Sequence, residues 1–81
     1  MDKELEEKLK QLFDKLIAPR AKANGWSSLE SRALYDDISK VWIVAVFYKQ
    51  VKKLQSMILF ENETQENAKK AVEVLNKLIK T

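Results

Sequence analysis

The stretch "KVWIVAVFYK", residues 40–49, limits the possible folds more than any other part of the chain. It holds eight apolar or aromatic residues in a row. A helix on the surface of a protein carries such residues along one side only. If this stretch is helical, its other sides must therefore be covered by something else.

Turn-forming residues are too scarce for an all-β fold. The 81 residues include one glycine and one proline, and they include no cysteine that could form a disulfide. All-β folds need many turns, so the composition favours helices. We therefore predict an all-α fold: a small helical bundle in a single domain over residues 1–81, with three main helices at about 2–18, 28–60 and 64–80.

The two outer helices are predicted from apolar stripes at helical spacing. The first stripe consists of Leu5, Leu9, Leu12, Phe13, Leu16 and Ile17. Pro19 should end or kink this helix, and Asn24-Gly25 is a left-handed stop or turn signal. The last stripe consists of Ala68, Ala71, Val72, Leu75, Leu78 and Ile79. Either Asn62 or Thr64 can cap the last helix.

The central segment gives two apolar seams on nearly opposite sides of a helical wheel. Ser27 and Glu30 have the spacing of a capping box, so a helix is expected to begin near residue 28. The first seam consists of Leu34, Ile38, Val41, Ala45 and Tyr48, and the second of Phe47, Val51, Leu54 and Ile58, led in by Ile43 and Val44. The two seams overlap in residues 41–48.

Two helical arrangements satisfy this pattern. In the first, a continuous helix of about 50 Å is covered by short helices at its two ends, and its apolar centre needs a second chain. In the second, the chain breaks near Asp36-Asp37, where either aspartate can cap a new helix, and a compact bundle results. We favour the continuous helix and a homodimer; an interior helix of a monomer and a groove for another protein remain open. The predicted dimer or partner interface consists of Leu34, Ile38, Val41, Trp42, Ala45 and Tyr48.

The positive charge is concentrated in the middle of the chain. The net charge is +3, and residues 18–60 contain seven basic and three acidic residues. A helix would place Tyr35, Trp42, Lys49, Lys53 and Phe60 along one edge, and aromatic rings beside lysines can stack bases and neutralise phosphates. A nucleic-acid-associated protein is therefore the alternative function. The predicted face for an anionic partner consists of Arg20, Lys22, Arg32, Lys49, Lys52 and Lys53.

The residue inventory argues against catalysis. The chain has no histidine and no cysteine, which are the commonest general base and a common nucleophile. Asp36 and Asp37 have no third carboxylate one helical turn away, so we expect no metal site and no cofactor. The charged start "MDKELEEKLK" lacks the apolar core of a signal peptide, and no apolar run reaches the length of a membrane span. We expect a cytoplasmic protein.

These observations predict a non-enzymatic small helical protein that acts by protein–protein contact and self-associates. An inhibitor, an adaptor or an immunity-type factor would fit. The stretch "LYDDIS", residues 34–39, resembles a segment of the small helical immunity proteins of bacteriocin producers. The resemblance covers six residues, which is too short to assign a role to any of them.

Overall fold

The computed structural model describes residues 3–80, except the side chain of Asn62. The predicted start of the first helix at residue 2 and the possible Asn62 cap lie outside the described part. The elements in chain order are α1 (Lys3–Leu12), the π-helical segment η1 (Phe13–Ile17), α2 (Ala18–Asn24), β1 (Ser27–Asp36), β2 (Val41–Gln50), β3 (Lys53–Glu63) and α3 (Gln65–Lys80).

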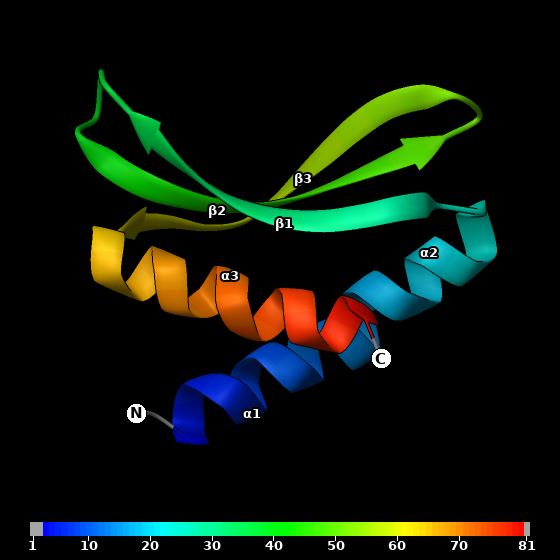
Figure 1. Ribbon diagram of the computed structural model, residues 1–81, viewed down its shortest axis with the longest axis horizontal. Helices are drawn as coiled ribbons and strands as arrows, with labels where there is room; N and C mark the ends of the chain where they lie inside the picture. The colour runs from blue at the N-terminus through cyan, green and yellow to red at the C-terminus, as the bar shows by residue number, and fades with distance from the viewer. Residues whose placement is uncertain (1–2, 81) are drawn as a thin grey trace.

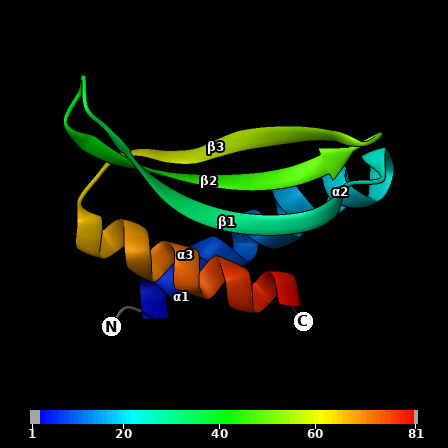
Figure 2. The same cartoon turned by 45° about the horizontal axis from the view of Figure 1, so that its top comes forward.

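Within residues 3–80 the chain forms an antiparallel sheet of three strands in the order β1-β2-β3, with the helices packed on one face (Figure 1). Turning the molecule confirms that α1 and α3 lie on the same side of the sheet (Figure 2). The prediction of an all-α bundle is therefore wrong, and the fold is α+β. The other face of the sheet is not covered by any element of the described residues.

The predicted central helix at 28–60 is replaced by the three strands. β2 is the middle strand and pairs with β1 and β3, so its backbone polar groups are satisfied on both sides. Val44 and Val46 point toward the helices and join the core, whereas Ala45 points to the opposite face. An apolar run of β-branched and aromatic residues suits such a strand. The two apolar seams predicted for the central segment are therefore not the faces of a helix, because their residues lie on three strands and the turns between them.

The two hairpin turns contain neither glycine nor proline. Val51 and Lys52 link β2 to β3 with φ angles of 50° and 65°. Positive φ at both positions is the geometry that closes a two-residue hairpin with the correct twist, and it usually selects Asn-Gly. Between β1 and β2, the Asp36 carboxylate accepts the backbone N–H of Ile38 at 3.0 Å. Asp36 does cap a chain reversal, but the reversal is a hairpin turn and not the start of a helix.

The expected capping box at the start of the central segment is also absent. Residues 27–30 begin β1, and Ser28 has a φ of 54° where the register between β1 and β2 shifts. A β-bulge of this kind bends the edge strand. Ser27 and Glu30 therefore belong to a strand with an irregular start.

The first helical region is longer than predicted. It passes through Pro19 and ends at Asn24, where Gly25 takes a left-handed conformation with φ of 66°. The π-helical segment precedes Pro19, and Pro19 then occupies the first turn of α2, where a missing N–H costs little. Beyond Gly25, Trp26 stacks on Tyr48 with ring centroids 3.7 Å apart and closes that end of the core.

α3 spans Gln65–Lys80, close to the predicted 64–80. Thr64 caps it, since its hydroxyl accepts the backbone N–H of Asn67 at 3.2 Å. The core lies between the helices and one sheet face, and its buried members are Leu9, Ile17, Val44, Val46, Ala68, Ala71 and Leu75. The apolar stripes of the outer helices are therefore buried against the sheet, not against a third helix.

Candidate interaction surface

The open face is the side of the sheet turned away from the helices. Paired residues on neighbouring strands point to the same side, so the register defines its members. Its apolar members are Leu34, Ile43, Ala45, Phe47, Leu54 and Ile58. Leu34, Leu54 and Ile58 are 43%, 69% and 55% exposed, so one aliphatic side chain on β1 and two on β3 meet solvent.

The centre of the open face is already close-packed. Ala45 is 1% exposed although no helix covers it, because it is the smallest side chain in a row with Arg32 and Ile58. The Arg32 guanidinium carbon lies 5.5 Å from the centre of the Phe47 ring, within range of a cation–π contact. Arg32 also donates a 3.0 Å hydrogen bond to the Glu30 carboxylate. These contacts hold the polar side chains of β1 against the sheet.

A shallow hollow of about 220 Å³ opens beside this centre. It is lined from all three strands by Ser28, Glu30, Arg32, Phe47, Lys49 and Leu54. Its walls combine an aromatic ring and an aliphatic side chain with charged groups at the rim. A hollow of this size can receive one large side chain of a partner.

The two ends of the sheet carry opposite charge. The end with the β1–β2 turn contains Asp36, Asp37, Glu61 and Glu63, with Lys40 as the cation of the turn. The end with the β2–β3 turn contains Lys49, Lys52 and Lys53, and α2 adds Arg20 and Lys22 beside it. We call these the acidic end and the basic end.

An exposed aliphatic residue projects from each turn. Ile38 is 93% exposed in the β1–β2 turn, and Val51 is 86% exposed in the β2–β3 turn. Figure 1 shows both turns rising on the side away from the helices. The open face therefore has an aliphatic side chain beyond each of its ends.

The predicted interface residues do not share one surface. Leu34 and Ala45 lie on the open face, and Ile38 lies in the turn at the acidic end. Trp42 and Tyr48 point to the helix-covered face, where both pack against the core. Val41 pairs with Asp36 at the last register position of β1. A common interface through a central helix is therefore excluded for this set.

The predicted cationic residues are brought together in part. Lys49, Lys52 and Lys53 lie at the basic end, and Arg20 and Lys22 belong to α2, which leads into β1 at that end. Arg32 lies instead at the middle of the open face, in its contact with Glu30.

Sequence reasoning omitted Ile43, Phe47, Leu54 and Ile58 from the candidate surface. Alternation along β2 would have separated Ile43, Ala45 and Phe47 from Trp42, Val44 and Val46, because successive strand residues point to opposite faces. Leu54 and Ile58 are spaced by an even number of residues, as expected of one strand face. This signal was present, but a helical reading of the segment hides it.

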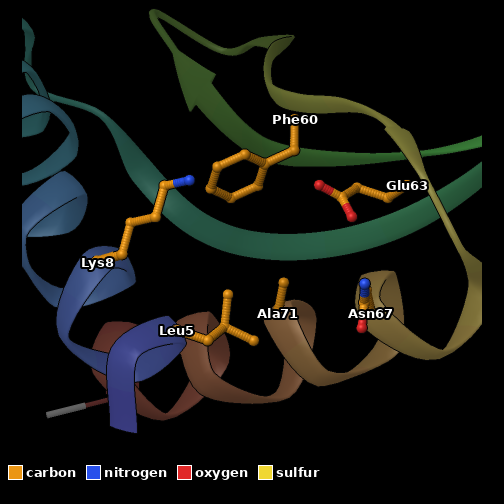
Figure 3. A pocket seen from close by; sticks show the side chains of 6 residues that line it. All are labelled: Leu5, Lys8, Phe60, Glu63, Asn67 and Ala71. Atoms are coloured by element: carbon orange, nitrogen blue, oxygen red, sulfur yellow. The ribbon is translucent and has the colours of Figure 1, made fainter. Parts of the chain in front are cut away.

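A second hollow lies on the helix side, between α1, the end of β3 and α3 (Figure 3). The Lys8 side chain reaches toward Phe60, and its ammonium lies 5.5 Å from the ring centre. Glu63 and Asn67 add polar groups on the other side of the ring. The hollow has a volume of about 210 Å³, below the ~300 Å³ at which small-molecule sites usually begin.

Residues 3–80 form neither a metal site nor a membrane-spanning helix. No group of three or more acidic residues there is arranged to hold a metal ion. No helix in the same residues has the length and apolar character needed to cross a membrane. Comparison of the chain with protein-family models, curated proteins and solved structures gives no match.

Proposed function

We propose that this chain is a non-enzymatic binding protein that holds another protein chain on its open face. The observation that carries the proposal is the row of exposed aliphatic side chains on a sheet face without a covering layer. Sheets bury an apolar face against another element. Here the helices cover one face, and the second apolar face is left for a partner.

The composition of the open face supports a protein partner. Phenylalanine and arginine are enriched at protein interfaces, and Phe47 and Arg32 line the same hollow. Leu34, Leu54 and Ile58 surround them with apolar surface. The hollow would receive a side chain of the partner, and the aliphatic residues would exclude water around it.

Nucleic acid is less well supported than the sequence pattern suggests. The stripe of aromatic and basic residues is divided between regions of the molecule. Tyr35 and Trp42 contact each other near the acidic end, with ring centroids 5.4 Å apart, whereas Lys49 and Lys53 lie at the basic end. Phe60 lies beside Lys8 on the helix side. The rings of this stripe are therefore not interleaved with the lysines of the basic end, as the stacking of successive bases would require.

Photo-crosslinking in cells of the native host tests the proposal. A benzophenone amino acid is placed at Leu54 or Ile58 on the open face, and at Lys77 on the exposed side of α3 as the matched control. We expect protein adducts from positions 54 and 58 and none from position 77. Adducts that disappear on nuclease treatment, or adducts only from position 77, would contradict the proposal.

A cytoplasmic location also belongs to this proposal. Fractionation of host cells, with the chain followed by mass spectrometry, tests it. Recovery of the chain in the membrane or secreted fraction would contradict the cytoplasmic location, but it would not contradict the binding role.

A further inference from the structure

We infer that the partner on the open face is a second copy of this chain, packed face to face with its strands running in the opposite direction. The inference rests on the proposed function and adds the identity and orientation of the partner. The observation behind it is that the same sheet has an apolar open face between an acidic end and a basic end.

Charge selects the orientation of the second copy. A symmetric pair of faces can be related by a twofold axis in the interface, either along the strands or across them. An axis along the strands would place Lys49 and Lys52 near the same residues of the second copy. An axis across the strands places them near Asp37 and Glu61 instead. Only the second arrangement brings opposite charges together at both ends.

The same axis also matches the shapes of the two faces. If it crosses β2 at Ala45, the strand register places Leu34 and Ile43 of one copy over Glu30 and Phe47 of the other. Those two positions line the hollow of the open face. Leu34, which is half-exposed in the single chain, would fill the hollow of the second copy, and the reverse contact would form by symmetry.

The aliphatic turn residues fit this arrangement as well. The β1–β2 turn of one copy then lies at the same end as the β2–β3 turn of the other, displaced sideways by one strand spacing of ~4.8 Å, so Ile38 of one copy lies near Val51 of the other. Both side chains are almost fully exposed in the single chain. Val51 is also a β-branched residue at positive φ, a conformation that such residues rarely adopt and that tends to occur at functional sites.

The area of the face predicts a weak dimer. Three strands about 4.8 Å apart and ten residues long give a face of roughly 14 by 33 Å. Two copies would bury about 900 Å², and the turn residues would raise this to near the ~1,000 Å² at which specific interfaces begin. We therefore expect association in the micromolar range of concentration, with the usual angle of about 30° between the packed sheets.

Sedimentation equilibrium of the whole chain, with charge reversal, provides the first test. One variant carries Lys49→Glu and Lys52→Glu, and the other carries Asp37→Lys and Glu61→Lys. Each alone should dimerise about tenfold more weakly than the parent chain, and a mixture of the two should recover the parent affinity. Association of the parent should weaken as salt rises, because salt screens the charges at the ends. Association that strengthens with salt would overturn the orientation.

Cysteine crosslinking gives the second test, and the chain has no cysteine of its own to interfere. Ile38→Cys mixed with Val51→Cys should be joined by a short bifunctional maleimide. Each variant alone should give little product. The twofold axis across the strands places the same turn of the two copies at opposite ends of the dimer, so identical cysteines lie far apart. Crosslinking of Ile38→Cys with itself would overturn the opposite strand direction.

A chain that remains monomeric at 9.4 kDa up to millimolar concentration would overturn the inference. The proposed function has a separate readout. An adduct from position 54 to a different protein would support that function while contradicting the second copy. If the chain forms no dimer and positions 54 and 58 give no protein adduct, both the proposed function and the inference of a second copy are contradicted.

Discussion

The Asn76 side chain of α3 pairs with both backbone polar groups of Ser31 on β1. Its amide oxygen accepts the Ser31 N–H at 2.8 Å, and its amide nitrogen donates to the Ser31 carbonyl at 3.2 Å. These bonds satisfy backbone groups that a neighbouring strand would otherwise pair. Asn76 therefore blocks part of the exposed edge of β1, and unprotected edges of this kind favour edge-to-edge aggregation.

Replacing Asn76 with alanine should lower the free energy of unfolding by about 2–3 kcal/mol, because two backbone groups lose their partners in a part-buried place. Urea denaturation followed by circular dichroism measures the loss. Asn67→Ala, an exposed position on the same helix, is the matched control and should change stability by less than about 0.5 kcal/mol. Equal effects of the two substitutions would contradict the role of Asn76.

The turn between β2 and β3 should be improved by residues that tolerate positive φ. Replacing Val51-Lys52 with Asn-Gly should raise the free energy of unfolding by about 1 kcal/mol, because asparagine and glycine adopt positive φ with less strain than other residues. Val51→Ala is the control, since it removes the exposed side chain but keeps a side chain at positive φ. Thermal unfolding at low protein concentration measures both. A lower melting temperature for Asn-Gly would contradict the turn geometry.

The two faces of the sheet should respond differently to the loss of a leucine. Leu75→Ala removes a fully buried side chain that packs on the helix-covered face, and it should cost about 3 kcal/mol. Leu54→Ala lies on the open face and should cost less than about 0.5 kcal/mol in the monomer. Chemical denaturation at a protein concentration well below the micromolar range, where the chain is expected to be monomeric, compares them. A large loss for Leu54→Ala would show that something in the chain covers the open face.

The outer helices could be predicted because their sequence pattern and their packing agree. The stripe of α3, with Ala71 and Leu75 at helical spacing, is buried as the pattern implies. Asn24-Gly25 is predicted to be a left-handed stop or turn signal, and Gly25 does take that conformation where α2 ends, although the first helix was predicted to stop at residue 18. Pro19 misled the prediction because the π-helical segment before it lets the helical path continue.

The sheet could not be predicted from a count of glycine and proline, because its two hairpin turns contain neither. Val51 and Lys52 occupy positions that normally require asparagine or glycine, and Lys40 adopts positive φ in the other turn. A count of glycine and proline therefore favoured helices. The β-branched and aromatic residues of β2 are the feature of the sequence that indicates a strand.

The candidate surface was predicted only in part for the same reason. A helical wheel groups Leu34, Ala45 and Tyr48, but a strand places Tyr48 on the face opposite to the other two. The wheel did group Phe47, Leu54 and Ile58, which share the open face. The prediction that the central segment is apolar on two sides is therefore correct. The residues were assigned to the wrong sides because a helical period of about 3.6 residues was used in place of the strand period of two.

The central claim is that the open face is the surface through which this chain makes contact. Methyl nuclear magnetic resonance spectra over a series of protein concentrations test it most directly. We predict that the methyl signals of Leu34, Ile43, Leu54 and Ile58 shift with concentration, while those of Leu9, Val46 and Leu75 stay fixed. Shifts confined to Leu12 of α1 and Leu16 of η1, or no shifts up to millimolar concentration, would contradict contact between copies through the open face.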